Sequence, residues 1–178
     1  MASFIGFIPT PAEQIEAFFE LAKPSESDVV YDLGSGDGRL LFAALEKGAG
    51  KAVGIELNHQ LVLKAVETAR KKGVQDRITF LEADVMDVNL HSASIVLCYL
   101  SVRGAASIRT KFESELQPGT KVVAEFFPIP GWRPAKTIKL QMKPFYLFTM
   151  PAEINPEAEE KDPLLEYLFP HPDPITRK

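Results

Sequence analysis

The sequence predicts an α/β fold, a three-layer, doubly wound, mostly parallel seven-stranded sheet with an antiparallel edge strand. Short apolar runs rich in β-branched residues alternate with longer segments of helical periodicity over residues 11–127. Two further apolar runs, at 137–141 and 145–149, are joined by a short connection, which favours an antiparallel pair. A length of 178 residues is enough for one such domain with a full core.

Composition narrows the classes of protein. The net charge is −4, so the chain offers no overall electrostatic reason to bind nucleic acid. The one cysteine, Cys98, excludes an internal disulfide and suits a reducing compartment. The N-terminal residues lack the basic region of a signal peptide, and no apolar run is long enough to span a membrane. The three histidines lack the spacing of metal ligands. We therefore expect a cytoplasmic protein with no metal and no membrane or nucleic-acid partner.

The elements are expected in a simple alternation. A helix is predicted over residues 11–22, with Thr10 as its N-cap and Pro11 in its first position. The first strand, 28–33, leads through a glycine turn into a helix over 40–47. The domain is predicted to span 1–150, with an acidic, proline-rich tail over 151–178. The other predicted elements are strands 51–56, 77–81, 94–100 and 121–127, and helices 60–72 (capped by Asn58) and 104–116.

The glycine turn is the most informative stretch. An apolar strand ends at Asp32, and glycines follow at positions 34, 36 and 38 before a helix begins. Glycines allow unusual backbone angles and let a ligand approach the main chain, so a strand, this turn and a helix predict a nucleotide-type binding corner. The spacing G-x-G-x-G differs from the dinucleotide pattern G-x-G-x-x-G, and taken alone it also describes a plain tight turn.

Polar side chains follow three further strands. Glu56 ends the second predicted strand, about twenty residues after the glycines, where Rossmann-type sheets place an acid against ribose hydroxyls. Asp84 follows the third strand and Tyr99 lies at the end of the fourth. Because carboxyl ends of parallel strands share one edge of a sheet, these residues are expected to meet Asp32 in one ligand cleft.

Residues 4 to about 150 resemble the small archaeal-type protein-lysine methyltransferases and their mitochondrial relatives, which are class I S-adenosylmethionine-dependent enzymes with a Rossmann-like fold. The G-x-G-x-G motif is shared by many methyltransferases, whereas its combination with an early Pro-Thr-Pro and a late Pro-Gly-Trp is more specific. The matching stretches are 7–11 (FIPTP), 31–39 (YDLGSGDGR), 54–56 (GIE), 98–100 (CYL), 116–120 (LQPGT) and 127–132 (FPIPGW).

The resemblance implies S-adenosylmethionine as cofactor. It implies that Asp84 reads the adenine amino group and that Val85 packs on the ring. The Pro-Thr-Pro segment is a rigid loop ahead of the first strand, and from that position we expect it to lie over the ligand as a lid. The residues implied to bind the cofactor are Thr10, Asp32, Gly34, Ser35, Gly36, Gly38, Glu56, Leu57, Asp84, Val85 and Tyr99.

The implied reaction is in-line attack of a lysine amine of a protein substrate on the sulfonium methyl group, which depends mainly on positioning. Tyr99 and Glu125 are the candidate catalytic residues, with Glu125 accepting a hydrogen bond from the amine. Tyr99, Phe126, Phe127 and Trp132 are candidates to line an apolar entrance that favours the uncharged amine.

Three alternatives stay open at this point. In the first, the protein is a methyltransferase whose acceptor is a small molecule. In the second, the protein is a nicotinamide-dependent oxidoreductase, since Glu56 also suits the ribose of a nicotinamide cofactor. The glycine spacing and Asp84 argue against this second alternative. In the third the protein binds the cofactor but has lost activity and serves as an interaction protein.

Overall fold

A computed structural model of the protein describes residues 9–100 and 102–156, with the side chains of 102 and 103 left out. Most of the predicted tail, 157–178, lies outside this range. The elements in chain order are α1 (Ala12–Ala22), β1 (Val29–Leu33), α2 (Arg39–Glu46), β2 (Lys51–Glu56), α3 (His59–Lys72), β3 (Ile78–Glu82), the 3-10 turn η1 (Val85–Asp87), β4 (Ile95–Cys98), α4 (Val102–Glu115), β5 (Lys121–Glu125), β6 (Trp132–Arg133), β7 (Lys136–Leu140), β8 (Lys143–Thr149) and β9 (Glu153–Ile154).

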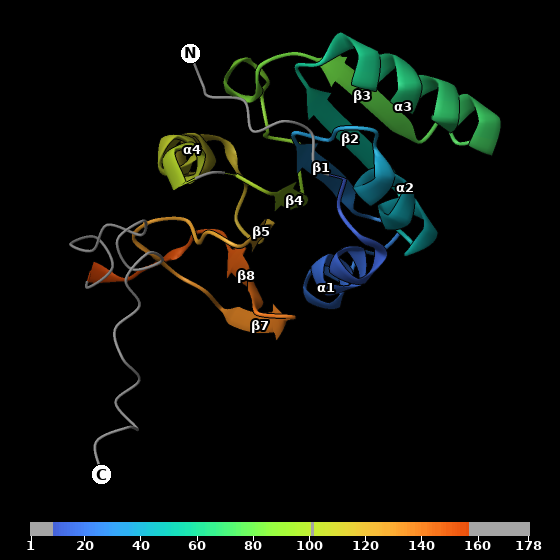
Figure 1. Ribbon diagram of the computed structural model, residues 1–178. Helices are drawn as coiled ribbons and strands as arrows, with labels where there is room; N and C mark the ends of the chain where they lie inside the picture. The colour runs from blue at the N-terminus through green and yellow to red at the C-terminus, as the bar shows by residue number, and fades with distance from the viewer. Residues whose placement is uncertain (1–8, 101, 157–178) are drawn as a thin grey trace.

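The predicted sheet is confirmed. Seven strands pair in the order β3-β2-β1-β4-β5-β8-β7. Strands β1 to β5 are parallel, and β8 runs antiparallel to both of its neighbours, β5 and β7. Strands β1 to β3 are added towards one side of the sheet, and after β3 the chain crosses back, so that β4 lies next to β1 on its other side (Figure 1). In open α/β sheets this switch point is where ligands bind, at the carboxyl ends of the strands.

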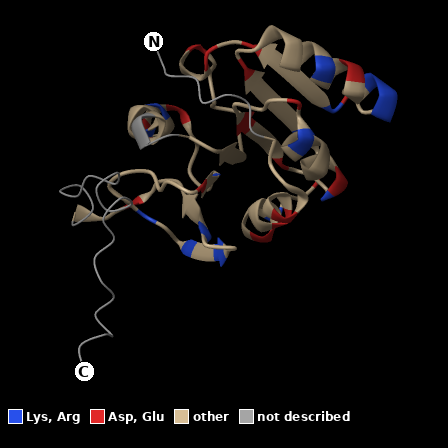
Figure 2. Ribbon diagram, in the orientation of Figure 1, with Lys and Arg blue, Asp and Glu red and all other residues tan. Residues whose placement is uncertain are grey.

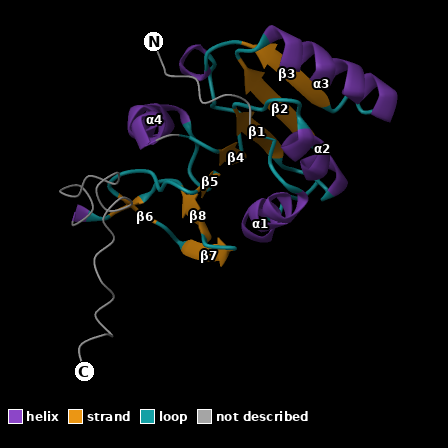
Figure 3. Cartoon of the chain, viewed as in Figure 1, coloured by secondary structure: helices purple, strands orange, loops and turns teal. Residues whose placement is uncertain are grey.

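Helices cover both faces of the sheet, which makes three layers (Figure 3). On one face α1 and α2 bury Phe18 and Leu41 against Val30 of β1 and against β8, where the ring of Phe145 meets Phe18 edge-on with centroids 5.2 Å apart. On the other face α4 buries Phe112 against the sheet. Since successive side chains of a strand point to opposite faces, β1 contributes to both cores.

Some predicted boundaries are wrong, for local reasons. Thr10 is not the N-cap of α1: Pro11 takes that position without a side-chain hydrogen bond, and its carbonyl accepts from Gln14 N. The strand predicted over 121–127 ends at Glu125, because Phe126 has a positive φ of 70° that cannot continue an extended strand. The strand predicted over 94–100 ends at Cys98.

A second, two-stranded sheet was not predicted. Trp132 of β6 pairs with Ile154 of β9, so residues just beyond the predicted boundary at 150 attach to the loop that follows β5. The boundary itself stays a prediction, as does the cytoplasmic location. Among the described residues no helix has the length and apolar character that crossing a membrane requires.

Candidate functional site

The glycine corner is tied to the end of β2 by main-chain hydrogen bonds. Gly34 N and Ser35 N both donate to the carbonyl of Ile55, at 2.9 and 3.0 Å. Gly34, Gly36 and Gly38 have φ values of 88°, 54° and 81°, which L-residues rarely adopt. The corner therefore forms a fixed loop at the carboxyl edge of β1 and β2, as the sequence predicts.

Close packing under the corner requires two glycines. A Cβ on Gly38 would lie 2.6 Å from Cζ of Phe80, and one on Gly54 would lie 2.5 Å from Oγ of Ser35. Ser35 is 4% exposed, and its Oγ has no hydrogen-bond partner. Here β2, β3 and the corner approach one another so closely that a methyl group does not fit.

Glu56 organises the corner as well as ending β2. Its Oε2 accepts from Gly36 N at 2.9 Å, and its Oε1 accepts from Asn58 N at 2.8 Å. Asn58 in turn caps α3 as predicted, accepting from Gln60 N and Leu61 N. Each carboxylate oxygen keeps a second lone pair. The acid is thus held in one orientation, with capacity left for the ribose hydroxyls it is expected to bind.

Asp32 is a buried carboxyl group on β1, at the glycine corner. It is 4% exposed on β1, beside Gly54 of β2 in register. Burial, and to a lesser extent the charge of Glu56, raises the pKa of Asp32 to about 7. A nearby cation lowers such a pKa, so Asp32 is suited to meet the positively charged methionine end of the cofactor.

Asp84 and Val85 lie in the turn after β3. The Oδ1 atom of Asp84 accepts from Met86 N at 2.9 Å and so caps the short turn η1. The main chain joins this turn to β2 through Ala83 N, which donates to the carbonyl of Glu56 at 3.2 Å. The two predicted adenine contacts are therefore next to the predicted ribose contact.

Large apolar side chains are exposed along the same edge. Leu57, Met86 and Tyr99 are 47%, 50% and 44% exposed, and they follow β2, β3 and β4. Such exposure after three strands at one edge of the sheet is typical of a surface that an adenine ring or another apolar ligand covers. The donor set and this surface fit S-adenosylmethionine: carboxylates for the ribose and the cationic end, and apolar side chains for the ring.

Glu125 lies beside Tyr99 at the edge. The register pairs Cys98 with Ala124, so the next residues along the two strands are Tyr99 and Glu125. Glu125 is 3% exposed and contacts Gln14 of α1, whose Nε2 donates to Oε1 at 3.1 Å. Lys143 Nζ lies 3.9 Å from the same oxygen, and it donates to the Gln14 amide oxygen at 2.6 Å. Burial raises the pKa of Glu125, and Lys143 opposes that shift.

Trp132 does not line the site, contrary to the prediction. It is 2% exposed and packs between Phe112 of α4 and Phe148 of β8, with ring centroids at 6.1 and 5.6 Å. Its Nε1 donates to Glu113 at 3.0 Å. Phe126 and Phe127 are half-buried and pack edge-to-face at 4.9 Å. Trp132 thus anchors the loop after β5 from behind.

Arg39 was not predicted as part of the site. It begins α2 directly after the glycines, and its Nε and Nη2 donate to the two carboxylate oxygens of Asp37 at 2.9 and 2.7 Å. Its Nη1 also donates to the carbonyl of Thr10 at 3.2 Å. Arg39 therefore ties Thr10 to the corner, which brings this predicted cofactor contact to the same edge as the others.

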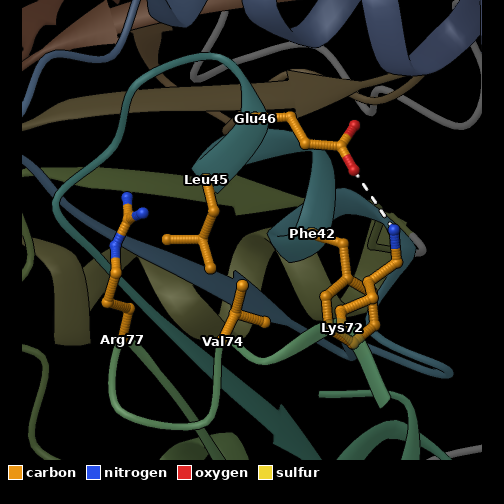
Figure 4. A pocket seen from close by; sticks show the side chains of 6 residues that line it. All are labelled: Phe42, Leu45, Glu46, Lys72, Val74 and Arg77. Atoms are coloured by element: carbon orange, nitrogen blue, oxygen red, sulfur yellow. Dashed lines mark hydrogen bonds and ion pairs between the residues drawn. The ribbon is translucent and has the colours of Figure 1, made fainter. Parts of the chain in front are cut away.

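Two cavities lie away from this edge. One, of about 290 Å³, is lined by residues of α2, the end of α3 and the segment before β3, and Lys72 of α3 pairs there with Glu46 of α2 (Figure 4). The other, of about 500 Å³, lies between α1 and β7. The basic end of α3, Arg70 to Lys72, also lies away from the glycine corner (Figure 2). None of these features contains a predicted site residue.

The fold and the site together define a class I methyltransferase: this strand order with a glycine corner after β1, an acid after β2 and an acid after β3. Among known families, the model of the ANTKMT methyltransferase domain matches residues 32–136. The chain belongs to this family and is an S-adenosylmethionine-dependent methyltransferase.

Individual relatives agree on the family. A protein-lysine N-methyltransferase of Saccharolobus islandicus is 36% identical over 138 residues, which are 77% of this chain and 86% of that protein. An adenine nucleotide translocase lysine N-methyltransferase of Mus musculus is 31% identical over 75% of this chain, which spans 58% of that protein. The crystal structure of an RNA methyltransferase from Salinibacter ruber with S-adenosyl-L-homocysteine has a TM-score of 0.80 and 36% identity, and the match covers 86% of this chain and 100% of that one.

A substitution of Glu56 tests the placement of the ribose. We expect Glu56→Ala to weaken binding of S-adenosylhomocysteine on the order of 100-fold, since hydrogen bonds to a charged group contribute about 1.5–3 kcal/mol each. The matched control is Glu82→Ala, because Glu82 is beside Glu56 in register and pairs with His59 at 2.6 Å. Calorimetric titration measures both. Equal affinity of the Glu56 variant and the natural protein would contradict the placement.

Proposed function

We propose that the protein transfers a methyl group from S-adenosylmethionine to the amine of a lysine side chain in a protein substrate. The observation that carries the proposal is the relationship to the Saccharolobus islandicus protein-lysine N-methyltransferase, most of whose length the chain matches. The Mus musculus relative, which is named for lysine methylation of the adenine nucleotide translocase, supports the same acceptor.

The geometry of the edge suits this reaction. When bound, the cofactor supplies an electrophilic methyl group on a sulfonium. Tyr99 and Glu125 come from adjacent strand ends, and the Phe126–Phe127 pair follows directly. An apolar, aromatic entrance disfavours the ammonium form of lysine and so supplies the neutral amine that attack requires. Glu125 is the proposed acceptor of a hydrogen bond from that amine, and Gln14 holds it in place.

The acceptor is tested with methyl-labelled S-adenosylmethionine and extracts of the source cells, separated into protein, RNA and small-molecule fractions. We expect label in protein, on lysine after hydrolysis, and much less of it when the Asp32→Asn variant replaces the natural protein. Label confined to RNA would overturn the proposal and would agree with the naming of the Salinibacter ruber protein as an RNA methyltransferase. Label confined to small molecules would overturn it in favour of the small-molecule alternative.

A further inference from the structure

A partly buried ion pair on α4, in which the Lys111 side chain is 7% and the Glu115 side chain 24% exposed, reaches the turn that carries the predicted adenine contacts. Lys111 is 8% exposed, which is unusual for a lysine, and its Nζ donates to Glu115 Oε1 at 2.7 Å. The pair spans one helical turn, a spacing that is ordinarily found on a solvated helix surface. Here both members also make a bond outside the helix.

Both outside bonds go to the segment after β3. Lys111 Nζ donates to the main-chain carbonyl of Met86 at 3.2 Å. Glu115 Oε2 accepts from the main-chain N–H of Leu90 at 2.8 Å. The pair therefore holds residues 86–90 at two points, while the Asp84 side chain and Ala83 N hold the beginning of the same segment.

We propose that Lys111 and Glu115 are positioning residues for cofactor binding, which fix the turn at Asp84 and Val85 so that it receives the adenine. This rests on the proposed contact between that turn and the adenine. Burying a lysine is costly unless it is paired and hydrogen-bonded. Because the outside bonds of both partners go to this one segment, the pair keeps the segment in a single arrangement before the ligand arrives, which removes an ordering cost from binding.

Calorimetric titration with S-adenosylhomocysteine and with adenosine tests the proposal. Lys111→Met is expected to weaken binding of both ligands by the same factor, about tenfold. Lys111→Arg keeps a donor at this position and is expected to bind within about threefold of the natural protein. The matched control is Lys72→Met, which breaks the surface pair with Glu46 and is expected to leave both affinities unchanged.

A second variant separates positioning from stability. Replacing both partners, Lys111→Met with Glu115→Met, avoids leaving the partly buried Glu115 carboxylate without its cation, so the thermal midpoint is expected to recover towards the natural value. The affinity is expected to stay low, since neither bond to residues 86–90 is restored, and the amides of this segment are expected to exchange faster with solvent.

Three outcomes would overturn the inference. If the Lys111→Met variant binds both ligands within twofold of the natural protein, the inference is wrong, although the cofactor site itself remains supported. Recovery of affinity together with stability in the double variant would show that the pair acts on the fold alone. Failure of the natural protein to bind S-adenosylhomocysteine would remove the cofactor site and this inference with it.

Discussion

Replacing Asp32 by Asn is expected to stabilise the protein at pH 8 while it removes most of the affinity for S-adenosylmethionine. The carboxyl is buried on β1, and its pKa of about 7 lies far above the ordinary value of 3.8. At pH 8 the folded protein must therefore carry a buried charge, which an amide of similar shape does not have. The same charge is what a cationic ligand needs, so stability and binding are expected to change in opposite directions.

The pH dependence has a definite sign. Between pH 4 and 7 the folded state holds the Asp32 proton that the unfolded state has lost, so this group's contribution to stability falls as pH rises through that window. A shift of about three pKa units corresponds to at most about 4 kcal/mol. The free energy of unfolding of Asp32→Asn relative to the natural protein is therefore expected to be higher at pH 8 than at pH 4.5.

Urea unfolding of both proteins at the two pH values measures this difference. Binding gives an independent reading: near pH 6.5 the natural protein is expected to release protons when S-adenosylmethionine binds, and the Asn variant is not. Calorimetry in buffers of different ionisation heat detects the release. A stability difference that is the same at both pH values, or equal cofactor affinity in the two proteins, would contradict the assignment of Asp32.

Gly38→Ala is expected to destabilise the fold by about 2–4 kcal/mol. The residue has a φ of 81°, which costs a non-glycine residue on the order of 1 kcal/mol, and its new methyl group would lie 2.6 Å from the ring of Phe80. Since Gly38 N also donates to the carbonyl of Ser35, displacement of the corner is expected to weaken cofactor binding as well.

Gly73→Ala is the matched control for this substitution. Gly73 ends α3 with a φ of 68°, and nothing lies within 4 Å of the position of its Cβ. It therefore isolates the backbone cost, expected near 1 kcal/mol. In the double variant Gly38→Ala with Phe80→Leu, a smaller side chain faces the new methyl group, so part of the loss is expected to return. Equal losses in the Gly38 and Gly73 variants by urea unfolding would rule out the steric contribution.

The order of the elements could be predicted because each depends on local pattern. Apolar runs separated by helical periodicity define β1 to β5, and Asn58 and the glycine corner are local signals. Boundaries that depend on a single backbone angle could not be predicted. An example is the end of β5, where the bulky residue Phe126 adopts a positive φ. The β6–β9 pairing joins segments about twenty residues apart, and no local pattern marks it.

The residues of the site also fall into a group that the sequence predicts and a group that only the structure reveals. Asp32, Glu56 and Asp84 follow from strand order alone, because parallel strands place their carboxyl ends at one edge. The supporting residues do not follow from strand order. Lys111 and Glu115 have the spacing of an ordinary surface pair, and only the structure shows that Lys111 is buried and donates to the carbonyl of Met86. An aromatic residue near the site suggests a ligand contact, which is why the sequence predicts Trp132 at the entrance. In the structure Trp132 is instead part of the hydrophobic core between α4 and the sheet.

The position of Trp132 also gives the molecule an intrinsic spectroscopic probe. The sequence contains one tryptophan, so all indole fluorescence comes from the point where α4 meets the loop after β5. Emission from a ring that is 2% exposed and packs against two phenylalanines is expected at short wavelength, and it should shift to the red when that loop leaves α4. A change of emission on adding a substrate would therefore report movement of the loop after β5 relative to α4.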